Sequence, residues 1–274
     1  MSSPASQPTS RTSLDTIALP GGRAALVVGH PGHELRVHRW LELARPVVCV
    51  LTDGSGHGEA GRLASTDQVV RAAGASAGSI YGRLSDRQVY DTLVGGNVAT
   101  WITLAHELTE QLRHFDVDYV VADAAEGFNP THDLCRYLVD AAIARLSRES
   151  GRALRAFEFD LDAAPGESVS PGESPALRID LDEDALDRKI QAALGYTEMR
   201  SEVDAILARF GGRAFSVEAF RLAHSGATQW PLDPSPEYER HGRNRIASGI
   251  YHTLITYRTH LEPVQTALAE WSRQ

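Results

Sequence analysis

Two histidines near the start of the chain are spaced like a local chelate. His30 directly follows an apolar run, and His33 comes three residues later, after Pro31 and Gly32. Pro and Gly allow the backbone to turn sharply, which would bring both imidazoles to one side. A catalytic zinc site needs three protein ligands and one open position. The stretch is therefore a candidate metal corner, and a plain turn with structural or solvated histidines is the alternative.

A third ligand would have to come from a distant part of the chain, and His132 is the best candidate. The stretch FNPTHD follows an apolar run and opens a helix, as the first histidine corner does. Asn129 can cap this helix, and Pro130 suits its first turn. His30, His33 and His132 are therefore the candidate ligand set.

Short apolar runs alternate with amphipathic segments along the chain. Apolar runs that end in glycine or polar residues are typical of buried strands, and the amphipathic segments between them are typical of helices. The predicted strands span residues 23–29, 45–54, 78–84, 117–124, 154–161 and 176–181. The predicted helices span residues 34–44, 58–75 and 99–114, with others opening at residues 130, 182 and 237, the last one broken near Pro263.

This alternation predicts an α/β fold, Rossmann-like, with a mainly parallel sheet and helices on both faces. Right-handed crossovers bring the carboxyl ends of parallel strands to one edge, where functional loops gather. His30, Asp53 and Asp123 each end a predicted strand, so we expect them at this edge. Residues 1–20 are rich in Ser, Pro and Thr and are predicted to be a disordered leader. A single domain with a helical C-terminal extension is predicted for residues 21–274.

Composition argues against several classes of protein. The net charge is −9 and the only lysine is Lys189, so a nucleic-acid-binding surface is not expected. No apolar run approaches the roughly 20 residues that cross a bilayer, and residues 1–15 lack the apolar core of a secretory signal. Cys49 and Cys135 make no disulfide framework, so we expect a cytoplasmic protein. No Gly-X-Gly-X-X-Gly pattern follows the first strand, which disfavours a dinucleotide site.

At these residues the chain resembles the PIG-L / LmbE family of zinc-dependent N-deacetylases, which hydrolyse acetamido groups on sugars. Residues 30–34 read His-Pro-Gly-His-Glu where the family has His-Pro-Asp-Asp-Glu. Thr-Asp-Gly at 52–54 and Gly-Glu-Ala-Gly-Arg at 58–62 are similar to the family's second loop. Residues 129–132 read Asn-Pro-Thr-His where the family has His-Pro-Asp-His. The resemblance implies an LmbE-like fold and a bound divalent metal, most simply zinc.

The resemblance also implies roles for individual residues. The family's three zinc ligands fall on His30, His33 and His132, and three neutral imidazoles suit zinc. The family's general base falls on Gly32, which cannot accept a proton. The histidine that stabilises the tetrahedral intermediate falls on Asn129, which could donate a hydrogen bond to an oxyanion but carries no charge. The metal ligands are thus kept, whereas the usual acid–base groups are lost.

Other polar residues in the strand-end loops are candidate site residues. Glu34 could orient His33 or a nearby backbone group, or could simply favour the first turn of a helix. Asp53 could bind the first histidine or substrate, or could only form a turn. Arg62 stands where the family has a substrate-binding arginine, and His57 could also reach substrate; a helix-terminal polar residue and a solvated histidine are the alternatives. The general base is unassigned among Glu34, Asp53, His57, Glu59 and Glu126.

These observations predict a metal-dependent hydrolase of a C–N amide bond, an N-deacetylase whose partner is a small molecule, an N-acylated sugar or amino-sugar conjugate. The metal would polarise the acyl oxygen and supply hydroxide. The alternative is a non-catalytic relative that binds a sugar-like ligand or a protein partner, because Gly32 and Asn129 replace two catalytic side chains. Activity gained by a Gly32→Asp variant would favour the hydrolase.

Overall fold

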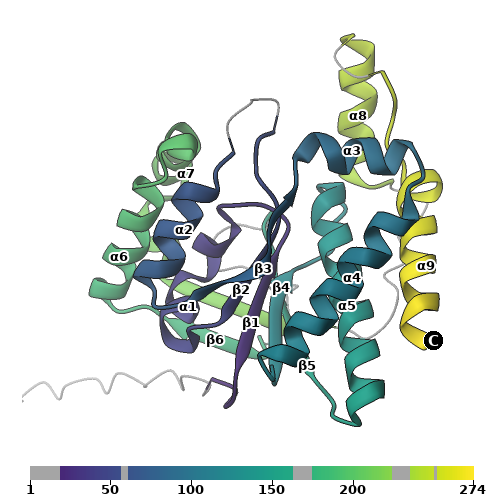
Figure 1. The fold of residues 1–274 in the computed structure, drawn as a ribbon. Coiled ribbons are helices and arrows are strands. Elements are labelled where there is room, and N and C mark those ends of the chain that lie inside the picture. Colours follow the sequence, from purple (N-terminus) through teal and green to yellow (C-terminus); the bar gives the residue numbers. More distant parts are fainter. Residues whose placement is uncertain (1–18, 57–60, 163–174, 224–234, 250–251) are drawn as a thin grey trace, which may run out of the picture.

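A seven-stranded sheet forms the centre of the computed structural model, which describes residues 19–56, 61–162, 175–223, 235–249 and 252–274 (Figure 1). The strand order in this described part is β3-β2-β1-β4-β5-β7-β6. The strands are β1 (Ala24–Val28), β2 (Val47–Thr52), β3 (Ser76–Leu84), β4 (Tyr119–Asp123), β5 (Arg155–Phe159), β6 (Leu177–Asp180) and β7 (Val217–Leu222). Most of the predicted leader, and residues 163–174, lie outside the described residues.

The strands from β3 to β5 are parallel, and β7 runs antiparallel to both β5 and β6. Every residue of β1, β2 and β4 is buried. Strands covered by helices on both faces have continuous apolar sequences, which is why these three were visible in the sequence. The predicted α/β class with a mainly parallel sheet is confirmed. Strand β7 was not predicted, and it makes the sheet mixed.

Helices cover the two faces of the sheet and enclose two hydrophobic cores (Figure 1). One core includes Trp101, Leu138 and Leu268, and the other includes Trp40, Val70 and Phe220. The first face carries α4 (Val98–His114), α5 (Pro130–Ser150) and α9 (Glu262–Arg273), and the second carries α1 (His38–Ala44), α2 (Leu63–Ala72) and α6 (Glu183–Leu194).

Several helices differ from their predictions. The predicted helix at 34–44 is split into a 3-10 turn, η1 (His33–Val37), and α1. A helix that was not predicted, α3 (Asp86–Val94), follows β3. The C-terminal region is divided into α8 (Glu237–Ala247), a π-helical turn η4 (Tyr257–Leu261) and α9, so Pro263 begins a helix instead of breaking one. The remaining helical segments are η2 (Thr197–Met199), α7 (Arg200–Phe210) and η3 (Gly212–Phe215).

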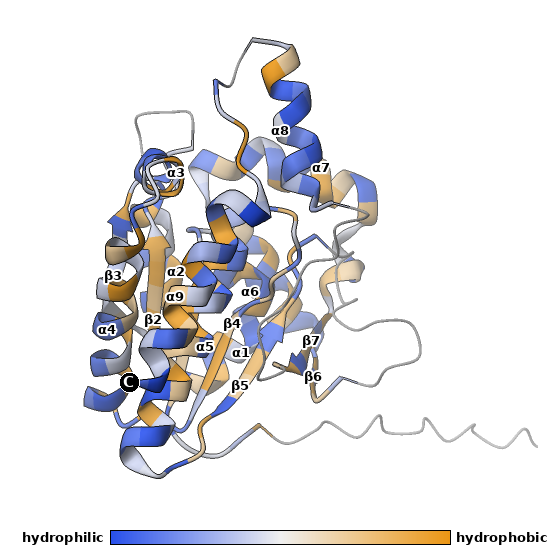
Figure 2. Ribbon diagram, turned by 90° about the vertical axis from the view of Figure 1, so that its right-hand side faces the viewer, coloured by the Kyte–Doolittle hydropathy of each residue, from blue (hydrophilic) through white to orange (hydrophobic). Residues whose placement is uncertain are grey.

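Hydrophobic residues gather on the strands, whereas α8 is largely hydrophilic (Figure 2). In the described part of the chain, no helix is both long and apolar enough to cross a membrane. Because β1, β2, β3 and β4 are mutually parallel, their carboxyl ends lie at one edge of the sheet. The histidine corner, the loop after β2, the start of α3 and the loop after β4 therefore meet there.

Candidate metal centre

A tight turn follows β1 and places two histidines beside each other. His33 N–H donates to the His30 carbonyl at 3.4 Å, and Gly32 adopts φ 103° between them. Only glycine takes up such a conformation readily. Gly29 lets neighbouring elements approach closely, because a Cβ there would lie 3.2 Å from Asp123 Oδ2 and 3.3 Å from the Thr131 carbonyl. The start of α5 is thereby held against the corner.

The three predicted ligands lie together at this edge. The ring centroids of His30 and His33 are 5.3 Å apart, those of His30 and His132 are 5.4 Å apart, and those of His33 and His132 are 4.7 Å apart. Three imidazoles that bind one zinc ion tetrahedrally, with Zn–N of about 2.0–2.1 Å, have centroids about 5 Å apart. Residues from distant parts of the chain thus form one histidine cluster, which is the name used below for His30, His33 and His132.

Two nitrogens of the histidine cluster are buried without hydrogen-bond partners, His30 Nε2 and His132 Nδ1. Leaving a buried polar atom unpaired costs about 1–3 kcal/mol, so such atoms usually have a functional reason. Burial, followed by the neighbouring histidines, lowers the pKa of His132 well below its usual value. The His132 ring is therefore neutral and offers a lone pair near neutral pH.

The donor set fits zinc in type, number and spacing of the rings. The imidazole nitrogens, however, do not point at one common position. Among the described residues, no group of three or more His, Cys, Asp or Glu side chains is placed to hold a metal ion. A metal in the histidine cluster would require the rings to turn about their side-chain bonds.

Glu34 and Asp53 have partners other than the imidazoles. The fully buried Glu34 accepts hydrogen bonds from Tyr196 Oη at 2.7 Å and from Gly32 N–H at 2.8 Å, so it orients the backbone of the corner. Burial raises the pKa of Glu34, against the effect of these hydrogen bonds. Asp53 Oδ1 accepts from Ser55 N–H at 2.9 Å, as a turn residue does. His30, which was the predicted partner of Asp53, forms a hydrogen bond with Thr52 instead.

The substrate-side candidates lie around the histidine cluster or outside the described residues. Asn129 caps α5, with Oδ1 accepting from Thr131 N–H at 2.9 Å, which leaves its NH2 group as the donor for a ligand. Arg62 lies over the loop after β2, because its Cδ is 3.4 Å from where a Cβ at Gly54 would be. His57 and Glu59 lie outside the described residues.

Met199 fills the space beside residue 32, where the sequence resemblance places the lost base. A Cβ at Gly32 would lie 2.6 Å from Met199 Sδ. A Gly32→Asp variant would meet both this sulfur and the left-handed backbone of residue 32. The variant is therefore a poor test of the lost base.

Gly32→Ala is expected to lower the free energy of unfolding by about 1–3 kcal/mol, the usual cost of a non-glycine residue in such a conformation. Chemical denaturation measures the change. Gly21→Ala is the matched control, because nothing lies within 4 Å of its Cβ position. Equal stability of Gly32→Ala and wild type would contradict the left-handed turn.

Asp86 was missed by the sequence reasoning, although it lies beside His30. Its Oδ1 is 3.1 Å from His30 Nδ1. The signal was present: Ser85 and Gln88 form a capping box directly after a predicted strand, which marks a helix start at the functional edge of the sheet. Burial alone would raise the pKa of Asp86, but His30, Thr52 and Gly56 outweigh it and lower this pKa below its usual range.

Glu126, one of the candidate bases, is bound to the backbone after β5. Its carboxylate accepts from Leu161 N–H at 2.8 Å and from Asp162 N–H at 3.0 Å. Burial nevertheless raises the pKa of Glu126 to about 7. The folded protein therefore binds this proton more tightly than the unfolded chain, whose glutamates titrate near pH 4.3.

The raised pKa predicts a pH-dependent stability. Between about pH 4.5 and 7 the folded state holds more protons at Glu126, so this residue's contribution to the free energy of unfolding falls as pH rises. Glu126→Gln, which stays neutral, should lack this fall. We expect the difference between wild type and variant to change by roughly 1–3 kcal/mol between pH 4.5 and 8, measured by urea denaturation. Parallel curves would contradict the assignment to Glu126.

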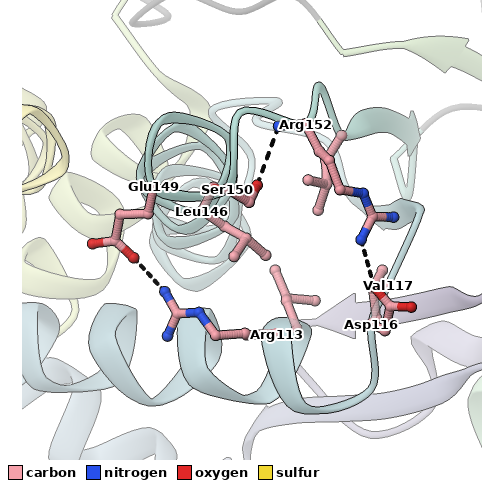
Figure 3. Close-up of a pocket in the computed structure, with 9 residues that line it drawn as sticks. Arg113, Asp116, Val117, Leu146, Glu149, Ser150 and Arg152 are labelled. Atoms are coloured by element: carbon pink, nitrogen blue, oxygen red, sulfur yellow. Dashed lines mark hydrogen bonds and ion pairs between the residues drawn. The ribbon is translucent and has the colours of Figure 1, made fainter.

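A pocket lies at the opposite edge of the sheet from the histidine cluster, between the ends of α4 and α5 (Figure 3). Its volume is about 240 Å³. Arg113 pairs with Glu149 there, and Arg152 pairs with Asp116. Both arginines are already paired with carboxylates, so this pocket does not suggest a site for an anionic ligand.

Comparison with known proteins gives distant structural neighbours. No family model matches the chain, and no curated protein matches it. The chain is similar to a triple mutant of a deacetylase of the teicoplanin biosynthetic pathway, with 15% identity, 75% of this chain and 100% of that chain covered, and a TM-score of 0.49. It is similar to the zinc-inhibited form of a teicoplanin deacetylase, with 14% identity, coverage of 83% and 94%, and a TM-score of 0.42.

A conserved protein of Thermus thermophilus is also similar, with 18% identity, coverage of 77% of this chain and 97% of that chain, and a TM-score of 0.45. Two of these three neighbours are named deacetylases. At these identities the neighbours bear on the fold alone.

Proposed function

We propose that this protein is a zinc-dependent hydrolase of a C–N amide bond, an N-deacetylase that acts on an N-acylated sugar or amino-sugar conjugate. The observation that carries the proposal is the histidine cluster, with two buried nitrogens that have no partner. Imidazole nitrogens at this spacing are a ligand set that zinc uses in proteins. The motif resemblance supports the choice of an amide substrate.

His30, His33 and His132 would hold the metal, which supplies Lewis acidity toward the acyl group and acidifies water. The NH2 group of Asn129, fixed by the cap of α5, would donate to the acyl oxygen as charge develops there. Arg62 would contact the polar part of the substrate from the loop after β2.

The described candidate bases are bound elsewhere, so turnover is expected to be slow. Glu34 is held by Tyr196, Asp53 by Ser55, and Glu126 by backbone after β5. Absence of a positioned general base costs about 10²–10⁴-fold in rate.

Metal-dependent release of acetate is the test. Zinc-loaded protein and chelator-treated protein would be incubated with N-acetylglucosaminyl conjugates, and acetate and free amine would be measured. Release that requires zinc and disappears in His30→Ala would support the proposal. No release from any conjugate by zinc-loaded protein would overturn it.

A second candidate function is ligand binding without hydrolysis. The position of Met199 favours it, because the sulfur lies where a side chain on residue 32 would begin. Saturable binding of the same conjugates in calorimetry, with no acetate released, would support this function.

A further inference from the structure

Two aspartates lie beside imidazoles of the histidine cluster, Asp123 beside His33 and Asp86 beside His30. Asp123 Oδ2 is 2.8 Å from His33 Nδ1, in a hydrogen bond. Asp86 Oδ1 is 3.1 Å from His30 Nδ1, but that nitrogen is hydrogen-bonded to Thr52 Oγ1 at 2.8 Å, and Asp86 Oδ1 has no hydrogen-bond partner. Both carboxylates approach the Nδ1 side of their ring.

Both carboxylates are held by backbone groups. Asp123 is fully buried, and its Oδ2 also accepts from Gly29 N–H at 2.7 Å. Asp86 Oδ2 accepts from Gly56 N–H at 2.5 Å. Their positions are thus set by the chain turns after β1 and β2, unlike those of surface ion pairs, whose side chains are free to move.

We propose that Asp123 is a positioning residue that keeps the proton of His33 on Nδ1, which leaves the Nε2 lone pair of this ring free for a metal ion. An ionised carboxylate only accepts hydrogen bonds, so the nitrogen that faces it carries the proton. In a neutral ring the other nitrogen then has the lone pair. On His33 that nitrogen is Nε2, because Asp123 faces Nδ1.

His132 differs from His33 in having no carboxylate beside its Nδ1. Its own Nδ1 is buried and has no hydrogen-bond partner. Neither nitrogen of His132 is therefore fixed by a carboxylate, whereas the tautomer of His33 is set before any ion arrives. Outer partners of this kind also raise the basicity of the ligand, and losing one typically costs about 10–100-fold in metal affinity.

The inference rests on the proposed metal site for its purpose, but its test does not need the metal. In zinc-free wild-type protein, ¹⁵N–¹H NMR correlations of the imidazoles should show His33 with the proton on Nδ1. The Nε2-protonated form of His33 would overturn the inference, whether or not the protein binds zinc. This measurement needs no variant and so cannot fail through misfolding.

Zinc affinity provides the second readout, from calorimetric titration of Asp123→Asn. We expect this variant to bind zinc about 10–100-fold more weakly than wild type. Asp91→Asn is the matched control, because it makes the same change on α3, where the exposed Asp91 pairs with Arg87. Wild-type affinity in Asp123→Asn would overturn the positioning role. Absence of zinc binding in wild type would overturn the proposed function, while the tautomer of His33 would still decide this inference.

Discussion

Replacing His132 with alanine is expected to abolish zinc binding and any hydrolysis that depends on it. His132 is only 5% exposed, and its ring centroid lies 5.4 Å from that of His30 and 4.7 Å from that of His33. Its removal leaves two imidazoles, which are too few for a catalytic zinc site. Because loss of an outer partner alone costs about 10–100-fold, loss of a ligand should weaken zinc binding by more than about 100-fold.

Elemental analysis of the purified proteins, followed by zinc titration, measures this loss. Wild type should contain one zinc per chain, and His132→Ala and His33→Ala should contain none. His106→Ala is the control, because this histidine is exposed on α4. Circular dichroism would show whether each variant is folded. Zinc retained by folded His132→Ala at wild-type affinity would place the metal elsewhere.

Glu218→Gln is expected to lower the free energy of unfolding by about 3–5 kcal/mol, the usual cost of breaking a buried ion pair. Glu218 on β7 is 2% exposed and pairs with Lys189 at 2.8 Å. Its carboxylate also accepts from Arg39 N–H and Trp40 N–H, both at 2.8 Å. The variant leaves a buried ammonium without its counter-charge and weakens the anchor of α1, which follows the histidine corner.

Urea denaturation measures this loss, with Glu183→Gln as control. Glu183 faces Arg213 in an ion pair whose side chains are both more than 80% exposed, and such a pair adds little. The double variant Lys189→Met, Glu218→Gln should recover part of the stability, because no charge remains buried alone. Glu218→Gln with wild-type stability would show that the pair does not support α1.

Much of the fold could be predicted because its signals are local. The apolar runs of β1, β2 and β4 end in polar or glycine residues, and a strand buried on both faces must have such a sequence. Strand β7 carries Glu218 and Arg221, so no apolar run marks it. These charges become tolerable only where Lys189 and Glu158 meet them, and a single stretch of sequence does not contain that information.

The histidine cluster was predictable because it follows from strand ends and a topological rule. His30 follows β1 and His132 opens the helix after β4, and parallel neighbours end at the same edge. The partners of the rings were not predictable. Asp86 reaches His30 because α3 begins beside the loop after β2, and Met199 reaches Gly32 from a segment far along the chain.

The mainly parallel sheet, the edge at which the three histidines gather and the identity of these histidines were all contained in the amino-acid sequence, since each depends on local patterns and on the handedness of crossovers. The tertiary structure alone decided which nitrogen of His30 and of His33 is held by a neighbouring residue, what fills the space beside Gly32, and which charges support the corner. Those outcomes depend on packing between elements far apart in the chain, where a shift of about one ångström changes a hydrogen-bond partner.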